Sequence, residues 1–333
     1  MTTETHEPIT RETQSSELIE PRPFPFNQRT FCNYEPVEKS INQARVLIVD
    51  NLLRNEDDLS AVARADWGKN TSVQLKRERQ IADLALQNIV ANVERLVKQP
   101  ETRIVHVTAV ADGVTEFRPH AIVLSGTLRD FDYYKPGILE DFAGFVRQTT
   151  TPVLGICGGH QLIGLSFGAR VITLDSQEQR ERRDNRITEY QYRLVRIVDP
   201  TDPIFLGIDN PQSGIWQDDT REGRNLRVWQ NHGLQLDRVP DGFALLATSY
   251  LCKNQMMVKR SQDQLIYSVQ FHLEKSFEDW NKSRTRWEHP NESRDGRILF
   301  ENFLRLALAS AANEHLKATD RDSNLGTIRR SER

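Results

Sequence analysis

Apolar positions along the chain fall into short continuous runs and into longer stretches with helical spacing. Residues 45–50 hold four consecutive apolar residues before an acid, which is typical of a parallel strand buried on both faces. Residues 74–98 carry apolar side chains three and four positions apart, which predicts a helix. Further strands are predicted at 103–107, 121–126 and 152–157, and further helices at 137–148 and from 159 to Gly168.

The second half changes to short strands separated by turn residues, and it closes with a helix. The strands are predicted at 193–198, 226–229, 243–247, 256–260 and 265–271. The helix spans 296–316, with Leu299, Phe303 and Leu306 on one stripe. Repeated strand–helix units predict an α/β fold, in which a mostly parallel central sheet has helices on both faces and a small antiparallel addition.

The two ends of the chain differ from this pattern. Residues 20–26 alternate proline with bulky residues, which favours an extended chain. We therefore predict a partly disordered leader at 1–43, and its aromatic side chains leave docking on a surface open as the alternative. Residues 317–333 are charged and aperiodic and are predicted to be disordered, so that the folded domain spans 44–316.

Composition excludes several classes of protein. The chain has 44 Lys and Arg against 47 Asp and Glu, a net charge of −3, so nothing favours binding to nucleic acid. No apolar run approaches the roughly 20 residues that span a bilayer, which argues against a membrane partner. Three cysteines are too few for a disulfide scaffold. These features predict a cytoplasmic location.

Cys157 lies in the segment with the most distinctive pattern. In Gly155-Ile156-Cys157-Gly158-Gly159, a buried strand meets a helix at the cysteine, and glycines stand two positions to either side. This is the form of a nucleophile elbow, in which a sharp turn lifts the reactive atom clear of the sheet. The positive end of a helix favours the thiolate. The alternative is a buried cysteine that only fills space.

A reactive cysteine needs a base, and two of the eight histidines stand in supporting motifs. His232 lies in Gln230-Asn231-His232-Gly233, and His272 follows the strongest strand of the second half. His160, next to the elbow, is expected to face away from the nucleophile. Glu274 lies two residues after His272, on the same side of an extended chain, where it can orient the imidazole. We therefore predict a Cys157–His272–Glu274 triad.

Five groups of residues match one known family in order along the chain. They are Val49-Asp50-Asn51, Leu124-Ser125-Gly126, Gly155-Ile156-Cys157-Gly158-Gly159-His160-Gln161, Asn231-His232-Gly233 and Val269-Gln270-Phe271-His272-Leu273-Glu274. With these motifs, the chain resembles the class I glutamine amidotransferases over roughly residues 44–310.

The resemblance implies a flavodoxin-like fold and a definite chemistry. Cys157 is expected to attack the side-chain amide of glutamine, giving a γ-glutamyl thioester and ammonia, while His272 moves protons and Glu274 holds it. The backbone N–H groups of Gly158 and Thr127 are expected to form an oxyanion hole. The substrate-binding positions that the resemblance implies are Gly126, Gln161, Asn231, Gly233 and Leu234.

The resemblance implies neither a cofactor nor a metal. Its substrate is glutamine, and the ammonia is expected to go to a separate synthetase or amidating partner, since no such module is recognised in this chain. Two alternatives stay open. One is a stand-alone hydrolase of γ-glutamyl amides or peptides, and the other is a non-catalytic regulatory or binding subunit on the same scaffold.

Three features depart from the family pattern. Thr127-Leu128-Arg129 stands where the family usually has a second glycine or a Gly-Pro pair, so the oxyanion hole is either misformed until a partner or substrate arrives or built differently. Leu273 replaces a proline between the histidine and the glutamate. Residues 51–102 look longer and more charged than usual. Together with 177–186 they are candidate docking surfaces, with solvated loops as the alternative.

Overall fold

The computed structural model describes residues 38–208, 225–275 and 294–328. The chain divides into two units, Met1–Tyr34 and Glu35–Arg333. The first unit lies outside the described residues, and with it most of the predicted leader. The fold described below therefore belongs to the second unit.

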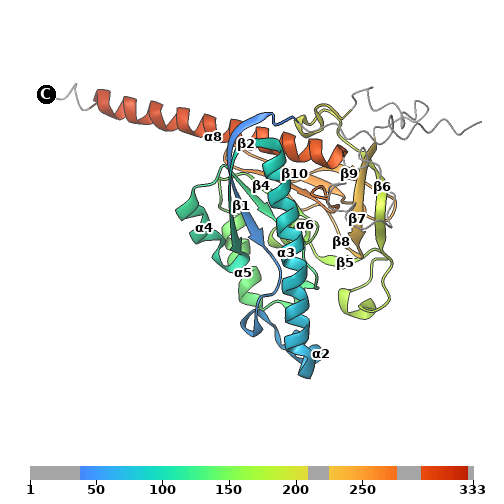
Figure 1. Cartoon of the computed structure of the whole chain (residues 1–333). Coiled ribbons are helices and arrows are strands. Elements are labelled where there is room, and N and C mark those ends of the chain that lie inside the picture. The colour runs from blue at the N-terminus through green and yellow to red at the C-terminus, as the bar shows by residue number, and fades with distance from the viewer. Residues whose placement is uncertain (1–37, 209–224, 276–293, 329–333) are drawn as a thin grey trace, which may run out of the picture. The chain divides into compact units, whose positions relative to one another are not determined.

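A nine-stranded sheet runs through the second unit in the order β2-β1-β3-β4-β11-β10-β9-β6-β7 (Figure 1). The first five strands are mutually parallel. They are β2 (Val97–His106), β1 (Ile41–Asp50), β3 (Ala121–Leu124), β4 (Val153–Ile156) and β11 (Leu265–Val269). Because parallel strands end at the same edge, residues that follow β3, β4 and β11 meet there.

Helices cover both faces of this parallel half. Successive side chains of a strand point to opposite faces, so β1 contributes Val46 and Ile48 to one core and Leu47 and Val49 to the other. The first core also contains buried residues of α3 (Thr71–Leu96) and α8 (Arg294–Ile328). The second contains residues of α2 (Ala61–Trp67), α4 (Val110–Phe117), α5 (Pro136–Val146) and α6 (Gly158–Ser166).

The remaining strands are antiparallel. They continue the same sheet as β10 (Met256–Arg260), β9 (Ala244–Thr248), β6 (Glu189–Ile197) and β7 (Asn225–His232). A separate pair is formed by β5 (Val171–Thr173) and β8 (Leu234–Leu236). The predicted α/β class, with a largely parallel sheet, helices on both faces and an antiparallel addition, is confirmed.

Several boundaries differ from the predicted ones. β1 begins at Ile41, and β2 begins at Val97, where the predicted helix was to end. α8 continues to Ile328, past residue 316. The domain limits proposed from the sequence stay a prediction. In the part of the chain that the structure describes, no helix has the length and apolar character to cross a bilayer.

Candidate active site

Cys157 stands at the junction of β4 and α6 in a conformation that few residues adopt. Its φ is 51° and its ψ is −103°. Its N–H donates to the Val269 carbonyl oxygen (2.8 Å), and its own carbonyl accepts from Gln161 N–H (3.1 Å) in the first turn of the helix. Positive φ at a residue with a side chain is strained and often marks a functional site. This is the elbow that the sequence predicted.

Close packing explains the glycines around the elbow. A Cβ atom on Gly155 would lie 2.6 Å from Ile163 Cδ1 and 2.8 Å from Gly159 O. A Cβ atom on Gly159 would lie 2.8 Å from Leu124 Cβ. Contacts this short do not occur between real side chains, so neither position accepts a larger residue without moving a strand.

His272 and Glu274 follow β11, the neighbour of β4. The register pairs Val269 with Ile156, so the segments after these two residues leave the sheet side by side. The backbone N–H of His272 donates to the Trp229 carbonyl (2.8 Å). Its Nδ1 lies 2.7 Å from Glu274 Oε1, in the arrangement of an oriented imidazole.

The charges of His272 and Glu274 stabilise each other. Burial by itself lowers the pKa of His272, but the charges of Glu274 and Cys157 and hydrogen bonds to both raise it to about 10. Burial by itself raises the pKa of Glu274, but the nearby imidazolium lowers it overall. The geometry therefore favours an imidazolium at His272, held by the Glu274 carboxylate, over the neutral pair.

Gly126 and Thr127 connect the two sides of the site. A Cβ atom on Gly126 would lie 3.6 Å from both Cys157 Cβ and His272 Cε1, so the two side chains border the same glycine. A Cβ atom on Gly158 would lie 2.6 Å from Thr127 Cγ2 and would overlap Thr127 N and Oγ1 more closely still. The two backbone groups predicted for the oxyanion hole, those of Gly158 and Thr127, are thus packed together.

The segment after Thr127 is held by α3, which lies within the stretch 51–102. Arg129 Nε donates to Glu78 Oε1 (2.6 Å) and Arg129 Nη2 to Gln74 Oε1 (2.8 Å), both on α3. Its guanidinium also lies over the Trp67 ring, 5.2 Å from the centroid. Glu78 is fully buried. Where the family pattern has glycine, this chain anchors the loop through a buried ion pair.

The stretch 51–102 and the 177–186 loop make further contacts with residues 130–134. Tyr134 Oη donates to the Asn51 carbonyl (2.7 Å). Arg183 Nη2 lies 2.7 Å from Asp132 Oδ2, and Arg186 Nη1 lies 2.7 Å from Asp130 Oδ1. These contacts tie the 177–186 loop to Asp130 and Asp132, and the role of both segments in docking a partner stays a prediction.

Leu273 does not leave the histidine and glutamate loosely held. Its side chain is buried, and a Cβ atom on Gly296 would lie 2.9 Å from its carbonyl oxygen. Asn92 Nδ2 donates to the Glu274 carbonyl (2.7 Å). Packing and one buried hydrogen bond fix the segment in which the family pattern has a proline.

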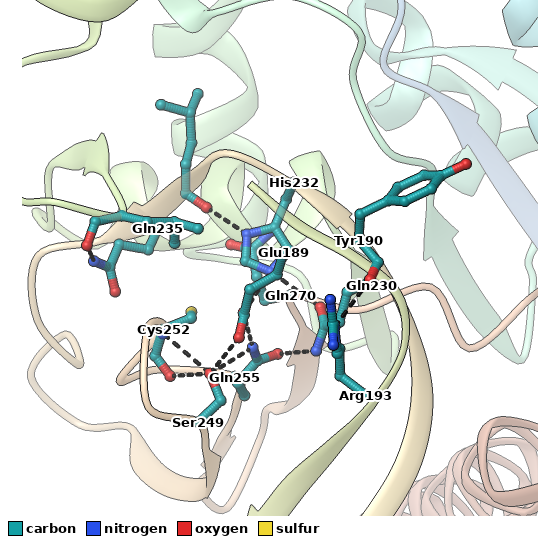
Figure 2. A network of polar contacts seen from close by, with 12 residues as sticks. Glu189, Tyr190, Arg193, Gln230, His232, Gln235, Ser249, Cys252, Gln255 and Gln270 are labelled. Carbon is teal, nitrogen blue, oxygen red and sulfur yellow. Dashed lines mark hydrogen bonds and ion pairs between the residues drawn. The ribbon is translucent and has the colours of Figure 1, made fainter. Parts of the chain in front are cut away.

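His232, the second candidate base, has both ring nitrogens occupied. Its Nδ1 faces the Leu234 carbonyl (2.9 Å), which can only accept a hydrogen bond. Its Nε2 faces Gln230 Oε1 (3.0 Å) and the Glu189 carboxylate (3.1 Å) (Figure 2). Both nitrogens are engaged in hydrogen bonds within this cluster, which leaves neither free to take a thiol proton.

Neighbouring amides fix the direction of the Gln230 side chain. Gln255 Nε2 donates to Glu189 (2.7 Å), which leaves Gln255 Oε1 to accept from Gln230 Nε2 (3.0 Å). The Gln230 amide therefore presents its oxygen to His232. This buried cluster is a structural anchor at the end of β7.

His160 is also unsuited to act as the base. It is fully buried on α6, and its Nδ1 lies 2.9 Å from Ser268 Oγ. Burial, and after it the charge of His232, lowers the pKa of His160 to about 3. Of the three histidines weighed from the sequence, His272 is the one beside Cys157.

Only some of the predicted substrate-binding residues contact one another. Gln161 Nε2 donates to the Leu234 carbonyl (3.2 Å), which joins α6 to the start of β8. A Cβ atom on Gly233 would lie 3.2 Å from the Ile187 carbonyl oxygen. Asn231 is exposed at the end of β7, and no hydrogen bond among the described residues ties its side chain to the triad.

Sequence reasoning missed Gln270. Its Nε2 lies 3.7 Å from Cys157 Sγ. The same spacing argument that linked residues 272 and 274 also places residue 270 on that side of an extended chain. No local sequence pattern predicted the ion pair between Arg129 and Glu78, which lie 51 positions apart in the chain.

Comparisons with known proteins agree with this geometry. Residues 81–288 match the family model of class I glutamine amidotransferases. A subunit of the glutamine-hydrolyzing GMP synthase of Thermococcus kodakarensis is 33% identical over 174 residues, 52% of this chain and 76% of that protein. The corresponding subunit of Methanothermobacter thermautotrophicus is 28% identical over 159 residues, 48% of this chain and 62% of that protein, which is less than two thirds of its length.

A solved structure shows the same fold. It is that of a Thermoplasma acidophilum protein assigned as a GMP synthase subunit. The TM-score is 0.51 at 21% identity, covering 83% of this chain and 98% of that one.

Proposed function

This chain belongs to the class I glutamine amidotransferase family, and from that premise we propose that it hydrolyses the side-chain amide of glutamine and supplies the ammonia to a separate synthetase. One arrangement carries the proposal. Cys157 stands at a strained elbow, and it borders Gly126 together with His272, which is hydrogen-bonded to Glu274. The named relatives are subunits of GMP synthase, which supports a nucleotide-amidating synthetase as the partner. A cytoplasmic location stays a prediction.

In the proposed reaction, the Cys157 thiolate attacks the amide carbon of glutamine. The carbonyl π electrons move to oxygen, and the oxyanion is stabilised by the N–H groups of Gly158 and Thr127. The C–N bond then breaks, the nitrogen takes the His272 proton, and ammonia leaves behind a γ-glutamyl thioester. Water loses a proton to His272, attacks the thioester and releases glutamate, which restores the thiolate and the imidazolium.

We assign recognition of glutamine to the elbow helix and to the turn after β7. Gln161 Nε2 is already shared between two acceptors, so its Oε1 is the atom proposed to accept from the substrate. Gly233 and Leu234 stand at the turn into β8, and Asn231 lies at the exposed end of β7.

The first experiment compares substrates on the purified protein. Glutamine, a γ-glutamyl peptide and a thiol-directed glutamine analogue are tested on the wild type and on Cys157→Ala, measuring released glutamate and the mass of the labelled peptide. We expect hydrolysis of glutamine, and labelling of Cys157 that disappears in the variant. Hydrolysis of the peptide alone would favour a stand-alone γ-glutamyl hydrolase. Absence of any labelling would favour a non-catalytic subunit.

A second prediction concerns the anchor of the oxyanion loop. Glu78→Gln removes the charge that holds Arg129, so Thr127 should lose its fixed position, and kcat should fall about tenfold with little change in KM. Steady-state glutamine hydrolysis measures this. Glu116→Gln is the control, because it breaks the exposed Arg103–Glu116 pair (3.1 Å) on another part of the surface and should leave kcat unchanged. An unchanged kcat in Glu78→Gln would show that the loop is held by other contacts.

A further inference from the structure

A hydrogen-bond donor faces the sulfur of Cys157 from a side chain that the proposed mechanism does not use. Gln270 is fully buried, and its Nε2 lies 3.7 Å from Sγ, within the range of a hydrogen bond to sulfur. Its backbone N–H donates to the Gln255 carbonyl (2.8 Å), so the residue is fixed to the adjoining strand region. The side chain cannot leave without abandoning buried partners.

The direction of the Gln270 amide follows from its neighbours. The Leu234 carbonyl can only accept, so the atom of Gln161 that lies 3.2 Å away must be Nε2. The same Nε2 lies 3.1 Å from the Gln270 amide, which must therefore present its oxygen there. The NH2 group of Gln270 is left to face Cys157.

The Leu234 carbonyl is in turn held from its other side. His232 donates to it through Nδ1 (2.9 Å), and the other ring nitrogen of His232, Nε2, lies 3.1 Å from Glu189 (Figure 2). Both residues are buried, which makes their hydrogen bonds costly to break. The acceptor that orients Gln161 is therefore itself fixed.

We propose that Gln270 stabilises the reactive sulfur by donating its amide N–H to Sγ, and that Gln161 is the positioning residue that sets the direction of this amide. The inference rests on Cys157 as the nucleophile of the proposed function. The inference adds a chain of hydrogen bonds whose directions are fixed, here called the relay. Gln161 Nε2 donates to the Leu234 carbonyl and to Gln270 Oε1, and Gln270 Nε2 donates to Cys157 Sγ. A donor at the sulfur favours the thiolate over the thiol.

Other ionisable groups also act on the sulfur. His272 interacts with it from the segment after β11 and is itself paired with Glu274. The buried thiol of Cys252, in the segment before β10, has its pKa raised by burial and, to a lesser degree, by the negative charges of Glu189 and Cys157. None of these groups is changed in the variants below. In Gln270→Met no ionisable group is added either, so the shift in that variant reports the amide alone.

The test measures the alkylation of Cys157 by iodoacetamide as a function of pH, read from the mass of the peptide that contains it. Gln270→Met keeps the unbranched side chain but removes the donor. The alkylation midpoint is the pH at which the rate reaches half its maximum, and we expect it to rise by about one pH unit. Below that pH, alkylation should be about tenfold slower than in the wild type. Where the methionine variant does not fold, Gln270→Glu serves instead. Its carboxylate beside the sulfur should raise the midpoint further.

Gln161→Glu tests the relay itself. A carboxylate at 161 cannot donate to Gln270, so the Gln270 amide should turn its NH2 group toward residue 161 and its oxygen toward the sulfur. We expect the midpoint to rise by about one pH unit in this single variant, and by less than about 0.3 unit when it is added to Gln270→Met. An equal shift in both backgrounds would reveal a through-space charge effect and would overturn the relay.

A matched control separates this role from general packing. Asn302 is a buried amide whose Nδ2 donates to the Ile204 and Leu206 carbonyls (both 2.8 Å). Asn302→Leu should lower the thermal unfolding midpoint but leave the alkylation midpoint unchanged. An unchanged midpoint in folded Gln270→Met would also overturn the proposal. The variants could show these shifts in the alkylation midpoint while the wild type fails to hydrolyse glutamine. That result would contradict the proposed glutaminase function but not the relay.

Discussion

His272→Ala should abolish glutamine turnover, a loss of at least about 10⁴-fold in kcat/KM. The substitution removes the cation that stabilises the thiolate and the proton that the departing nitrogen needs. Steady-state release of glutamate measures the loss. His120→Gln is the control, because this residue lies at the amino end of β3, where its Nδ1 accepts from Arg45 N–H (3.1 Å). Near-normal turnover in His272→Ala would mean that the proposed base is wrong.

The pH profile of Glu274→Gln checks the same ion pair from its other side. His272 has its pKa raised to about 10, so the wild type should lose its imidazolium, and with it kcat/KM, only as the pH rises toward about 10. Removing the Glu274 charge removes the first of the causes that raise this pKa. The alkaline limb should therefore move to lower pH, with part of the activity retained. An alkaline limb that does not move would separate Glu274 from the titration of His272.

Gly158→Ala should lower kcat by about 10²-fold or more, although it adds only a methyl group. That group would lie 2.6 Å from Thr127 Cγ2 and closer still to Thr127 N, so the loop must move away from the helix. Loss of one oxyanion donor costs about 10² to 10³ in kcat. Cys157 should still react with iodoacetamide, because the thiol itself is untouched. Steady-state kinetics and alkylation together distinguish loss of the hole from loss of the nucleophile.

The control for this substitution is Gly144→Ala in α5, where a Cβ atom meets nothing within 4 Å. Alanine is the better helix former there, so this variant should gain about 0.5 to 1 kcal/mol in the free energy of unfolding, with unchanged kcat. Thermal unfolding measures the gain. A kcat for Gly158→Ala within about threefold of the wild type would exclude the proposed pair of N–H donors.

Local patterns were enough to predict the candidate chemistry-bearing segments, because the signals in those segments are local. The glycines around Cys157 are required by contacts within one strand–turn–helix unit. The pairing of His272 with Glu274 follows from the alternation of side chains in extended chain, and the two atoms lie 2.7 Å apart. The choice of His272 over His232 rested on the carboxylate at position 274. The structure adds a second reason, because both ring nitrogens of His232 have partners in another cluster.

By itself, then, the order of amino acids determined the family, the α/β class and the identity of the residues at the elbow and after β11. The tertiary structure decided how they meet. The parallel pairing of β4 with β11 carries His272 to Cys157, α3 supplies Glu78 to the loop after Thr127, and Gln161 reaches Gln270 across the sheet edge. These contacts join residues far apart in the chain. They depend on the packing of whole elements, which no short stretch of sequence encodes.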